Sequence, residues 1–136
     1  MGRVRGSETI LVVEDHEGVR SLIVGTLELC GFHVLQAADG AEALRQVAQH
    51  VGPIDLLLTD VIMPGMNGKE VADQLAILRP GIKVLFMSGY SGELIAHHGV
   101  LEAGVAYLPK PFTPDSLTAK VREMLGSEDQ KRPQKG

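Results

Sequence analysis

The sequence lacks tryptophan, contains a single cysteine and is poor in aromatic residues, which make up 4% of its 136 positions. Because Cys30 has no second cysteine to pair with, an internal disulfide is excluded, and a reducing compartment is favoured. No apolar run approaches the roughly 20 residues of a membrane-spanning helix. Residues 1–8 also lack the apolar core of a secretion signal. We therefore expect a cytoplasmic protein, or a cytoplasmic piece of a longer one.

Basic residues are also in the minority. Thirteen Lys and Arg residues stand against seventeen Asp and Glu residues, which gives a net charge of −4. A domain that binds nucleic acid normally carries a basic stripe instead. The composition therefore predicts no direct contact with nucleic acid, and the chain offers no membrane segment.

Short runs rich in Val, Ile and Leu alternate with stretches whose apolar residues recur at helical spacing. Five strand–helix pairs in strict alternation predict an α/β fold, a doubly wound parallel sheet with helices on both faces. A chain of this length suits one such domain. The predicted strands are 9–15, 33–37, 54–60, 83–89 and 105–110.

Cap residues indicate where two of the predicted helices begin. Asp39, followed three residues later by Glu42, predicts an N-cap with its reciprocal partner. Thr113 and Pro114 predict the cap and first position of the last helix. The stretch 93–103 predicts a weaker helix, because a glycine interrupts it.

The two ends of the chain differ from its middle in composition. We expect residues 8–125 to form the domain and residues 1–7 to be an N-terminal tail or linker. Residues 126–136 are polar and aperiodic, so we expect a disordered C-terminal tail.

The third predicted strand ends on an ionisable residue. Leucines occupy positions 56–58, and Asp60 follows two positions after the last of them. An unpaired charge in a buried setting is costly. Sites in open α/β sheets form outside the carboxyl ends of the strands, where Glu14, Asp15, Ser88 and Lys110 are also expected. Carboxylates that converge repel one another unless a cation joins them, and such hard oxygen ligands suit Mg²⁺.

Each of these residues also has an ordinary structural explanation when it is taken alone. Asp60 could form a turn or cap a helix, and the acidic pair at 14–15 could cap the first helix. Ser88 could belong to a turn, and Lys110 could be a solvated loop residue. Their convergence on one edge of the sheet favours a functional site.

At these positions the chain resembles the receiver domain of two-component response regulators, over roughly residues 8–125. It most resembles receivers attached to hybrid sensor histidine kinases. The resemblance implies a (βα)₅ flavodoxin-like fold with strand order 2-1-3-4-5. The motifs that carry it are VVED at 12–15, LLLTDVIMPGMNG at 56–68, MSGY at 87–90 and YLPKPF at 107–112.

The resemblance also implies a role for each site residue. Asp60 is expected to accept a phosphoryl group from a phosphohistidine on a sensor histidine kinase or a histidine phosphotransfer protein. Lys110 pairs with the phosphate as a point charge, Ser88 donates a hydrogen bond to it, and the Lys110–Pro111 bond is expected to be cis. The implied Mg²⁺ ligands are Asp15, Asp60 and the backbone carbonyl of Ile62, with Glu14 assisting directly or through water.

Tyr107 lies where the family keeps its switch aromatic. Phosphorylation of Asp60 is expected to draw Ser88 toward it, and Tyr107 then fills the vacated space from the face made by the fourth helix, fifth strand and fifth helix. An amphipathic rim position with a solvated hydroxyl is the alternative for Tyr107.

The chain differs from the commoner family residue at two positions, and it has bulky residues at two others that vary in the family. Glu14 replaces an aspartate, and Ser88 replaces a threonine, so that a methyl group is lost beside the hydroxyl. Ile62 and Tyr90 are bulky at positions that border the phosphoryl group. We expect both to hinder the hydrolytic water and lengthen the phosphorylated state.

The resemblance implies a signalling domain and not an enzyme, since it catalyses only its own phosphorylation and dephosphorylation. The cognate kinase, the stimulus, the output and the oligomeric state, including a phosphorylation-dependent dimer, stay open. So does the choice between a stand-alone receiver and a fragment of a hybrid kinase.

Two other functions compete for the same fold. An aspartyl-nucleophile, Mg²⁺-dependent phosphatase needs a general acid two residues after the nucleophile, where this chain has Ile62. A flavodoxin-like cofactor carrier needs amides and hydroxyls at the first strand–helix turn, where this chain has acidic residues.

Overall fold

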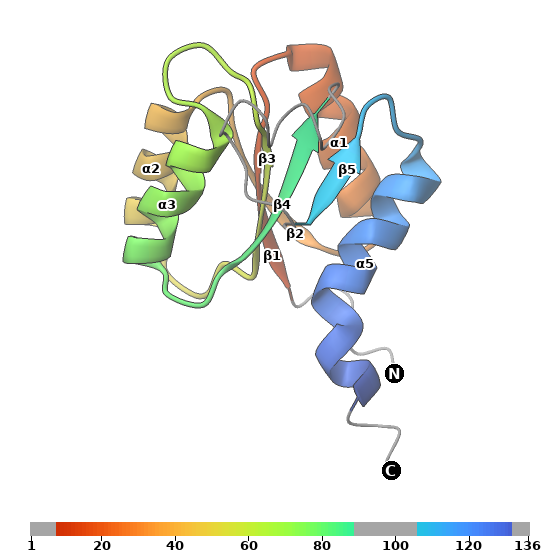
Figure 1. The fold of residues 1–136 in the computed structure, drawn as a ribbon. Helices are drawn as coiled ribbons and strands as arrows, with labels where there is room; N and C mark the ends of the chain where they lie inside the picture. Colours follow the sequence, from red (N-terminus) through yellow and green to blue (C-terminus); the bar gives the residue numbers. More distant parts are fainter. Residues whose placement is uncertain (1–7, 89–105, 132–136) are drawn as a thin grey trace.

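The computed structural model describes residues 8–88 and 106–131. Its elements are β1 (Thr9–Val13), α1 (Glu17–Leu29), β2 (His33–Ala37), α2 (Gly40–Gln49), β3 (Leu56–Asp60), α3 (Gly68–Leu78), β4 (Lys83–Ser88), β5 (Tyr107–Pro109) and α5 (Pro114–Lys131). The strands form one parallel sheet in the order β2-β1-β3-β4-β5. This confirms the doubly wound fold and the strand order. Figure 1 shows α2 and α3 on one face of the sheet, and α1 and α5 on the other.

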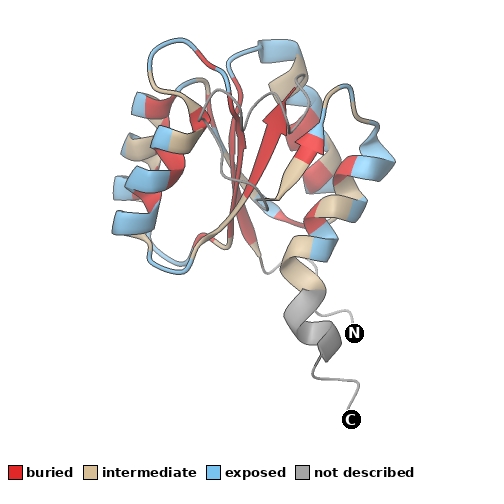
Figure 2. Cartoon of the chain, in the orientation of Figure 1, coloured by how far each residue is buried: buried red, intermediate tan, exposed pale blue. Residues whose placement is uncertain are grey.

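The core consists of two apolar layers, one on each face of the sheet. Successive side chains of a strand point to opposite faces, so Ile10 and Val12 pack with the α1 and α5 side, while Leu11 and Val13 pack with the α2 and α3 side. Every residue of β1 and β3 is buried, and Figure 2 shows this burial concentrated in the strands. Burial on both faces explains why these strands are continuous apolar runs without alternation.

The predicted cap residues are present, but the Glu42 carboxylate accepts from the Ala38 backbone N–H at 2.9 Å and not from the Asp39 N–H that a reciprocal pair requires. The Asp39 side chain accepts a hydrogen bond from the Glu42 backbone N–H at 2.8 Å, at the start of α2. The Thr113 hydroxyl accepts one from the Ser116 backbone N–H at 3.0 Å, and α5 begins at Pro114. These local signals locate helix starts because the cap satisfies an N–H that the helix itself leaves without a partner.

Two further caps were not expected. His16 caps α1, since its Nδ1 accepts from the Val19 N–H at 3.2 Å, so the acidic pair before it is not the cap. Asn67 and Glu70 form a reciprocal capping box at the start of α3. Both caps lie in the loops that leave the carboxyl ends of strands, and they fix the direction in which those loops enter a helix.

The last helix is longer than the composition suggested. α5 runs from Pro114 to Lys131, so the disorder expected from residue 126 onward is wrong for residues 126–131. Ser, Glu, Asp, Gln and Lys follow Gly126, and a helix already anchored by packing can propagate through such residues at little cost. The division of the chain at 7/8 and 125/126 stays a prediction.

The helix expected at 93–103 lies outside the described residues, as does Tyr90. Among the residues that are described, no helix is long and apolar enough to cross a membrane.

Gly68 makes the closest backbone approach beside β3. A Cβ atom at this position would press against the carbonyl oxygen of Asp60 and lie 3.0 Å from Cα of Val61. The Gly68 N–H donates to the Val61 carbonyl at 2.8 Å. The loop therefore turns back onto the end of β3, and only a residue without a side chain fits.

We predict that Gly68→Ala lowers the free energy of unfolding by about 3 kcal/mol, because the new methyl group meets backbone that cannot move aside. Urea denaturation measures the change. Gly126→Ala is the matched control: a Cβ atom added at Gly126 in α5 would have no neighbour within 4 Å, so this variant should be unchanged or gain up to about 1 kcal/mol in helix propensity. Equal stability of the two variants would contradict the prediction.

Candidate functional site

The parallel strands bring the predicted site residues to one edge of the sheet. Glu14 and Asp15 follow β1, Asp60 ends β3, and Ser88 ends β4. Ser88 pairs with Pro109, the last residue of β5, and Lys110 follows Pro109 in the chain. The Lys110 N–H donates to the Ser88 carbonyl at 2.8 Å. The strand ends meet here because all five strands run in the same direction.

The ammonium group of Lys110 lies between two buried carboxylates. Its Nζ is 2.7 Å from Asp60 Oδ1 and 2.9 Å from Glu14 Oε1. Asp60 is 4% exposed and Glu14 is 1% exposed, so neither carboxylate relies on bulk water. The Lys110–Pro111 peptide is cis, as the resemblance implied.

Glu14 uses both of its carboxylate oxygens within the protein. While Oε1 accepts from Lys110, Oε2 accepts from the His16 backbone N–H at 2.9 Å. The longer side chain of glutamate thus reaches the lysine and also fixes the turn that leads into α1.

Three acidic residues converge closely enough to hold a cation. One carboxylate oxygen from each of Glu14, Asp15 and Asp60 lies within 4.8 Å of the others. Two of the three residues are buried, and Asp15 is exposed. A donor set made only of oxygen atoms, with one side open to solvent, fits a hard divalent ion that keeps part of its hydration shell.

The pKa values of Asp60, Glu14 and Lys110 reflect their mutual contact. Burial, and then the neighbouring Glu14 carboxylate, raise the pKa of Asp60 from 3.8 to about 7, although Lys110 acts in the opposite direction. Burial also disfavours ionised Glu14, but its hydrogen bonds with Asp60, the His16 N–H and Lys110 together lower its pKa. Burial disfavours the charged form of Lys110 too, yet the two carboxylates outweigh it and raise the lysine pKa.

These shifts determine how the site affects stability as the pH changes. Because the folded-state pKa of Asp60 lies above its unfolded value, its contribution to stability is full below pH 3.8 and is lost as the pH rises through about 7. Glu14 has a lowered pKa, so its contribution is present above about pH 4.5 and is lost as the pH falls. The two carboxyl groups therefore oppose each other on acidification.

Three further predicted residues lie in or just after the strands that carry this cluster. Ser88 is buried at 4% exposure, while the Ile62 side chain is 53% exposed just beyond β3. Tyr107 is half-buried at the start of β5 and packs against the apolar layer on the α2 and α3 side. The roles of these residues in phosphate contact, metal ligation and switching stay predictions.

An apolar hollow beside Lys110 was not identified from the sequence. It has a volume of about 440 Å³ and is lined by Val19, Leu22, Pro111 and Phe112 together with the lysine stem. Leu22, on α1, is 49% exposed. Only the structure shows this exposure.

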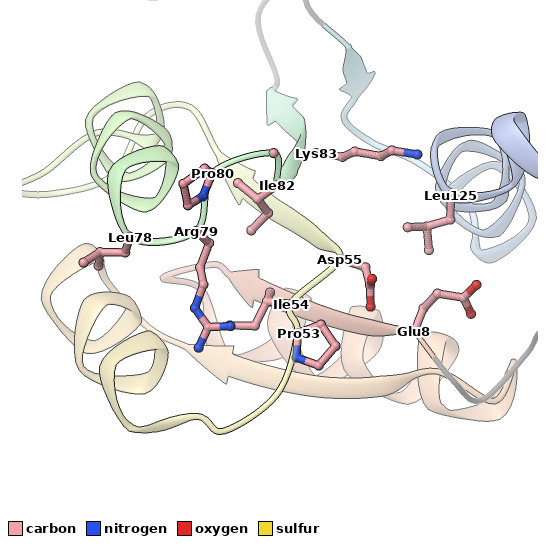
Figure 3. Close-up of a pocket in the computed structure, with 11 residues that line it drawn as sticks. Glu8, Pro53, Ile54, Asp55, Leu78, Arg79, Pro80, Ile82, Lys83 and Leu125 are labelled. Carbon is pink, nitrogen blue, oxygen red and sulfur yellow. The ribbon is translucent and has the colours of Figure 1, made fainter.

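A second cavity, of about 530 Å³, lies at the opposite end of the strands, near their amino ends. Its charged side chains mostly hold the fold together. Arg79 donates to the carbonyls of Val47, His50 and Gly52. Lys83 extends toward α5 in Figure 3, where its Nζ donates to the Met124 carbonyl at 3.0 Å. This cavity is separate from the acidic cluster, so we identify the site by its chemistry and not by cavity volume.

We predict opposite effects on the Asp60 pKa when either neighbour is neutralised. Lys110→Met should raise it above about 7, because a favourable positive charge is lost, and Glu14→Gln should lower it, because a repelling carboxylate is lost. Carbon-detected NMR of the Asp60 carboxyl group in metal-free buffer measures both values. Unchanged pKa values in both variants would show that burial alone controls this group, and shifts of the same sign would contradict the prediction.

Comparisons with known proteins agree with this geometry. The family model described as "Response regulator receiver domain" matches residues 10–122. The chain is 39% identical to the sensor kinase CckA of Brucella abortus (strain 2308) over 124 residues, which is 91% of this chain and 13% of that protein. The chain therefore corresponds to a small part of that relative.

Two solved structures show the same fold. The receiver domain of the hybrid histidine kinase CckA superposes with a TM-score of 0.73 at 39% identity, covering 86% of this chain and 98% of the other. The response regulator TrrA of Thermotoga maritima, in complex with Mg²⁺ and BeF, superposes with a TM-score of 0.73 at 31% identity, covering 87% and 99%. Together with the converging carboxylates and lysine, these matches show that the chain belongs to the response regulator receiver domain family.

Proposed function

We propose that Asp60 is the phosphoacceptor of this receiver domain. The observation that supports the assignment is its buried carboxylate, which lies 2.7 Å from the Lys110 ammonium and beside the carboxylates of Glu14 and Asp15. An oxygen of Asp60 attacks the phosphorus of a phosphohistidine, and the histidine nitrogen leaves with the bonding electron pair. The product is an acyl phosphate on Asp60.

The converging carboxylates fit Mg²⁺. Asp15 and Asp60 are the direct protein ligands in this proposal, together with the backbone carbonyl of Ile62. Glu14 contributes through water, because both of its oxygens already accept hydrogen bonds from the protein. Mg²⁺ held by these residues would offset negative charge on the transferring phosphoryl group, and TrrA, with 31% identity, was solved with Mg²⁺.

Lys110 and Ser88 stabilise the phosphorylated form. Lys110 already contacts Asp60 Oδ1 at 2.7 Å, so it can move to a phosphate oxygen without leaving the site, where it acts as a point charge. Ser88 ends the neighbouring strand and donates its hydroxyl hydrogen to a second phosphate oxygen.

Movement of Ser88 toward the phosphate is the first step of the proposed switch, and Tyr107 responds to it. Tyr107 begins β5 and pairs with Phe86, two residues before Ser88 in the neighbouring strand β4, so a shift of Ser88 acts on Tyr107 through this pair of strands. The surface that changes includes β5 and α5, and the expected helix at 93–103 lies outside the described residues.

The apolar hollow formed by Val19, Leu22, Pro111 and Phe112 receives the phosphodonor. It lies against Lys110, so a partner that covers it brings its phosphohistidine to the acidic cluster and excludes water. We propose a sensor histidine kinase or a histidine phosphotransfer protein as this partner, in the cytoplasm. No observation in the described residues favours the phosphatase or the flavin carrier.

We predict that acetyl phosphate with Mg²⁺ labels the parent chain with one hydroxylamine-labile phosphate, and that Asp60→Asn reduces the labelling about a hundredfold, because the amide is a poor nucleophile. Radiolabel incorporation measures the effect, and a chelator should suppress it in the parent. Asp73→Asn is the matched control, since Asp73 pairs with Lys69 on the surface of α3. Undiminished labelling of Asp60→Asn would refute the assignment.

We also predict that Ile62→Asn shortens the phosphorylated lifetime roughly tenfold, equivalent to about 1.4 kcal/mol in the hydrolysis barrier. The isoleucine side chain shields the mouth of the site, whereas asparagine can hydrogen-bond the attacking water. Decay of labelled protein after removal of the donor measures the rate. Ile62→Leu keeps the apolar bulk and should decay like the parent; identical decay of the asparagine variant would exclude a shielding role.

A further inference from the structure

Arg20 contacts the backbone of the acidic cluster although it belongs to none of the motifs that identify the site. It lies in the second turn of α1 and is half-buried. Its Nη1 donates to the backbone carbonyl of Glu14 at 2.8 Å, and its Nε donates to the Gln36 side-chain oxygen at 3.2 Å. The planar guanidinium thus connects the ends of β1 and β2 from one side chain.

The carbonyl that Arg20 contacts belongs to the peptide that joins the two acidic residues. On its other side, the Glu14 N–H donates to the Ala37 carbonyl at 3.1 Å. The Glu14 side chain is held by Lys110 and the His16 N–H. Asp15 differs, because it is exposed and its direction depends on the backbone that Arg20 holds.

Gln36 is in turn held in place. Its backbone carbonyl accepts a hydrogen bond from Gln46 Nε2 of α2 at 3.2 Å. Arg20 therefore bonds to the side chain of a residue whose backbone, near the end of β2, is tied to the opposite helical layer.

We propose that Arg20 is a positioning residue for the cation site, which holds the Glu14–Asp15 backbone so that the Asp15 carboxylate meets that of Asp60. This inference rests on the proposed function, since it concerns the metal that the cluster binds. Groups that hydrogen-bond to the residues carrying the metal ligands commonly contribute tenfold to a hundredfold to metal affinity.

The positive charge of Arg20 allows a test by sign. If Arg20 acted on the cation only through its charge, removing that charge would relieve repulsion and tighten Mg²⁺ binding. If Arg20 positions Asp15, the same removal weakens binding. Arg20→Met keeps most of the apolar stem and loses the donors, whereas Arg20→Lys keeps the charge and one donor that can reach the Glu14 carbonyl.

Isothermal titration of the full chain with Mg²⁺ alone measures these affinities. We expect Arg20→Met to bind about tenfold more weakly than the parent, with Arg20→Lys between the two. Arg45→Ala removes an equal charge from an exposed position on α2 and should leave the affinity unchanged. Binding by Arg20→Met that equals or exceeds that of the parent would overturn the proposal.

Thermal unfolding in metal-free buffer shows whether each variant is folded. If Arg20→Met does not fold, Arg20→Lys decides the question: weaker Mg²⁺ binding than the parent supports the proposal, and equal or tighter binding overturns it. Labelling of the parent by acetyl phosphate separates this result from the proposed function. A parent that takes no label contradicts the phosphoacceptor assignment, whereas a labelled parent with unchanged affinity in the variants contradicts only the role of Arg20.

Discussion

The contact of the Lys110 ammonium with the carboxylates of Asp60 and Glu14 is the interaction on which the rest of the site depends. Two buried carboxylates side by side repel each other and lose their hydration, and either effect alone is costly. The lysine, at 2.7 and 2.9 Å, compensates both groups at once. A bound cation and a phosphoryl group then act on charges that the protein already holds close together.

The sheet keeps this arrangement rigid. Helices cover both faces, and the central strands β1 and β3 are fully buried, so the strand ends that carry the acidic residues have little freedom to move. Gly68 adds to this by letting the following loop fold back against the carbonyl of Asp60. A reactive cluster supported by strands is held more precisely than one supported by loops.

The glutamate at position 14 gives the two residues of the acidic pair different contacts. Its extra methylene lets one oxygen reach Lys110 while the other accepts from the His16 N–H. The side chain therefore acts first as the partner of the lysine, and the exposed Asp15 is the member of the pair that faces solvent. This division makes the backbone between the two residues, and so Arg20, important for the cluster.

The amino-acid sequence alone determined the fold class, the strand order through its family resemblance, the caps at Asp39 and Thr113, and the set of residues at the carboxyl ends of the strands. These features depend on local spacing and propensity, or on motifs in a fixed order, which a reader can see in the printed chain. The contacts of Glu14 with Lys110, 96 residues later, and of Arg20 with Gln36 did not follow from it. Nor did the cap at His16, the exposure of Leu22 or the continuation of α5 to Lys131. Tertiary structure decided these because each depends on where a side chain or helix end lies relative to distant chain, and the spacing of residues along the chain does not contain that distance.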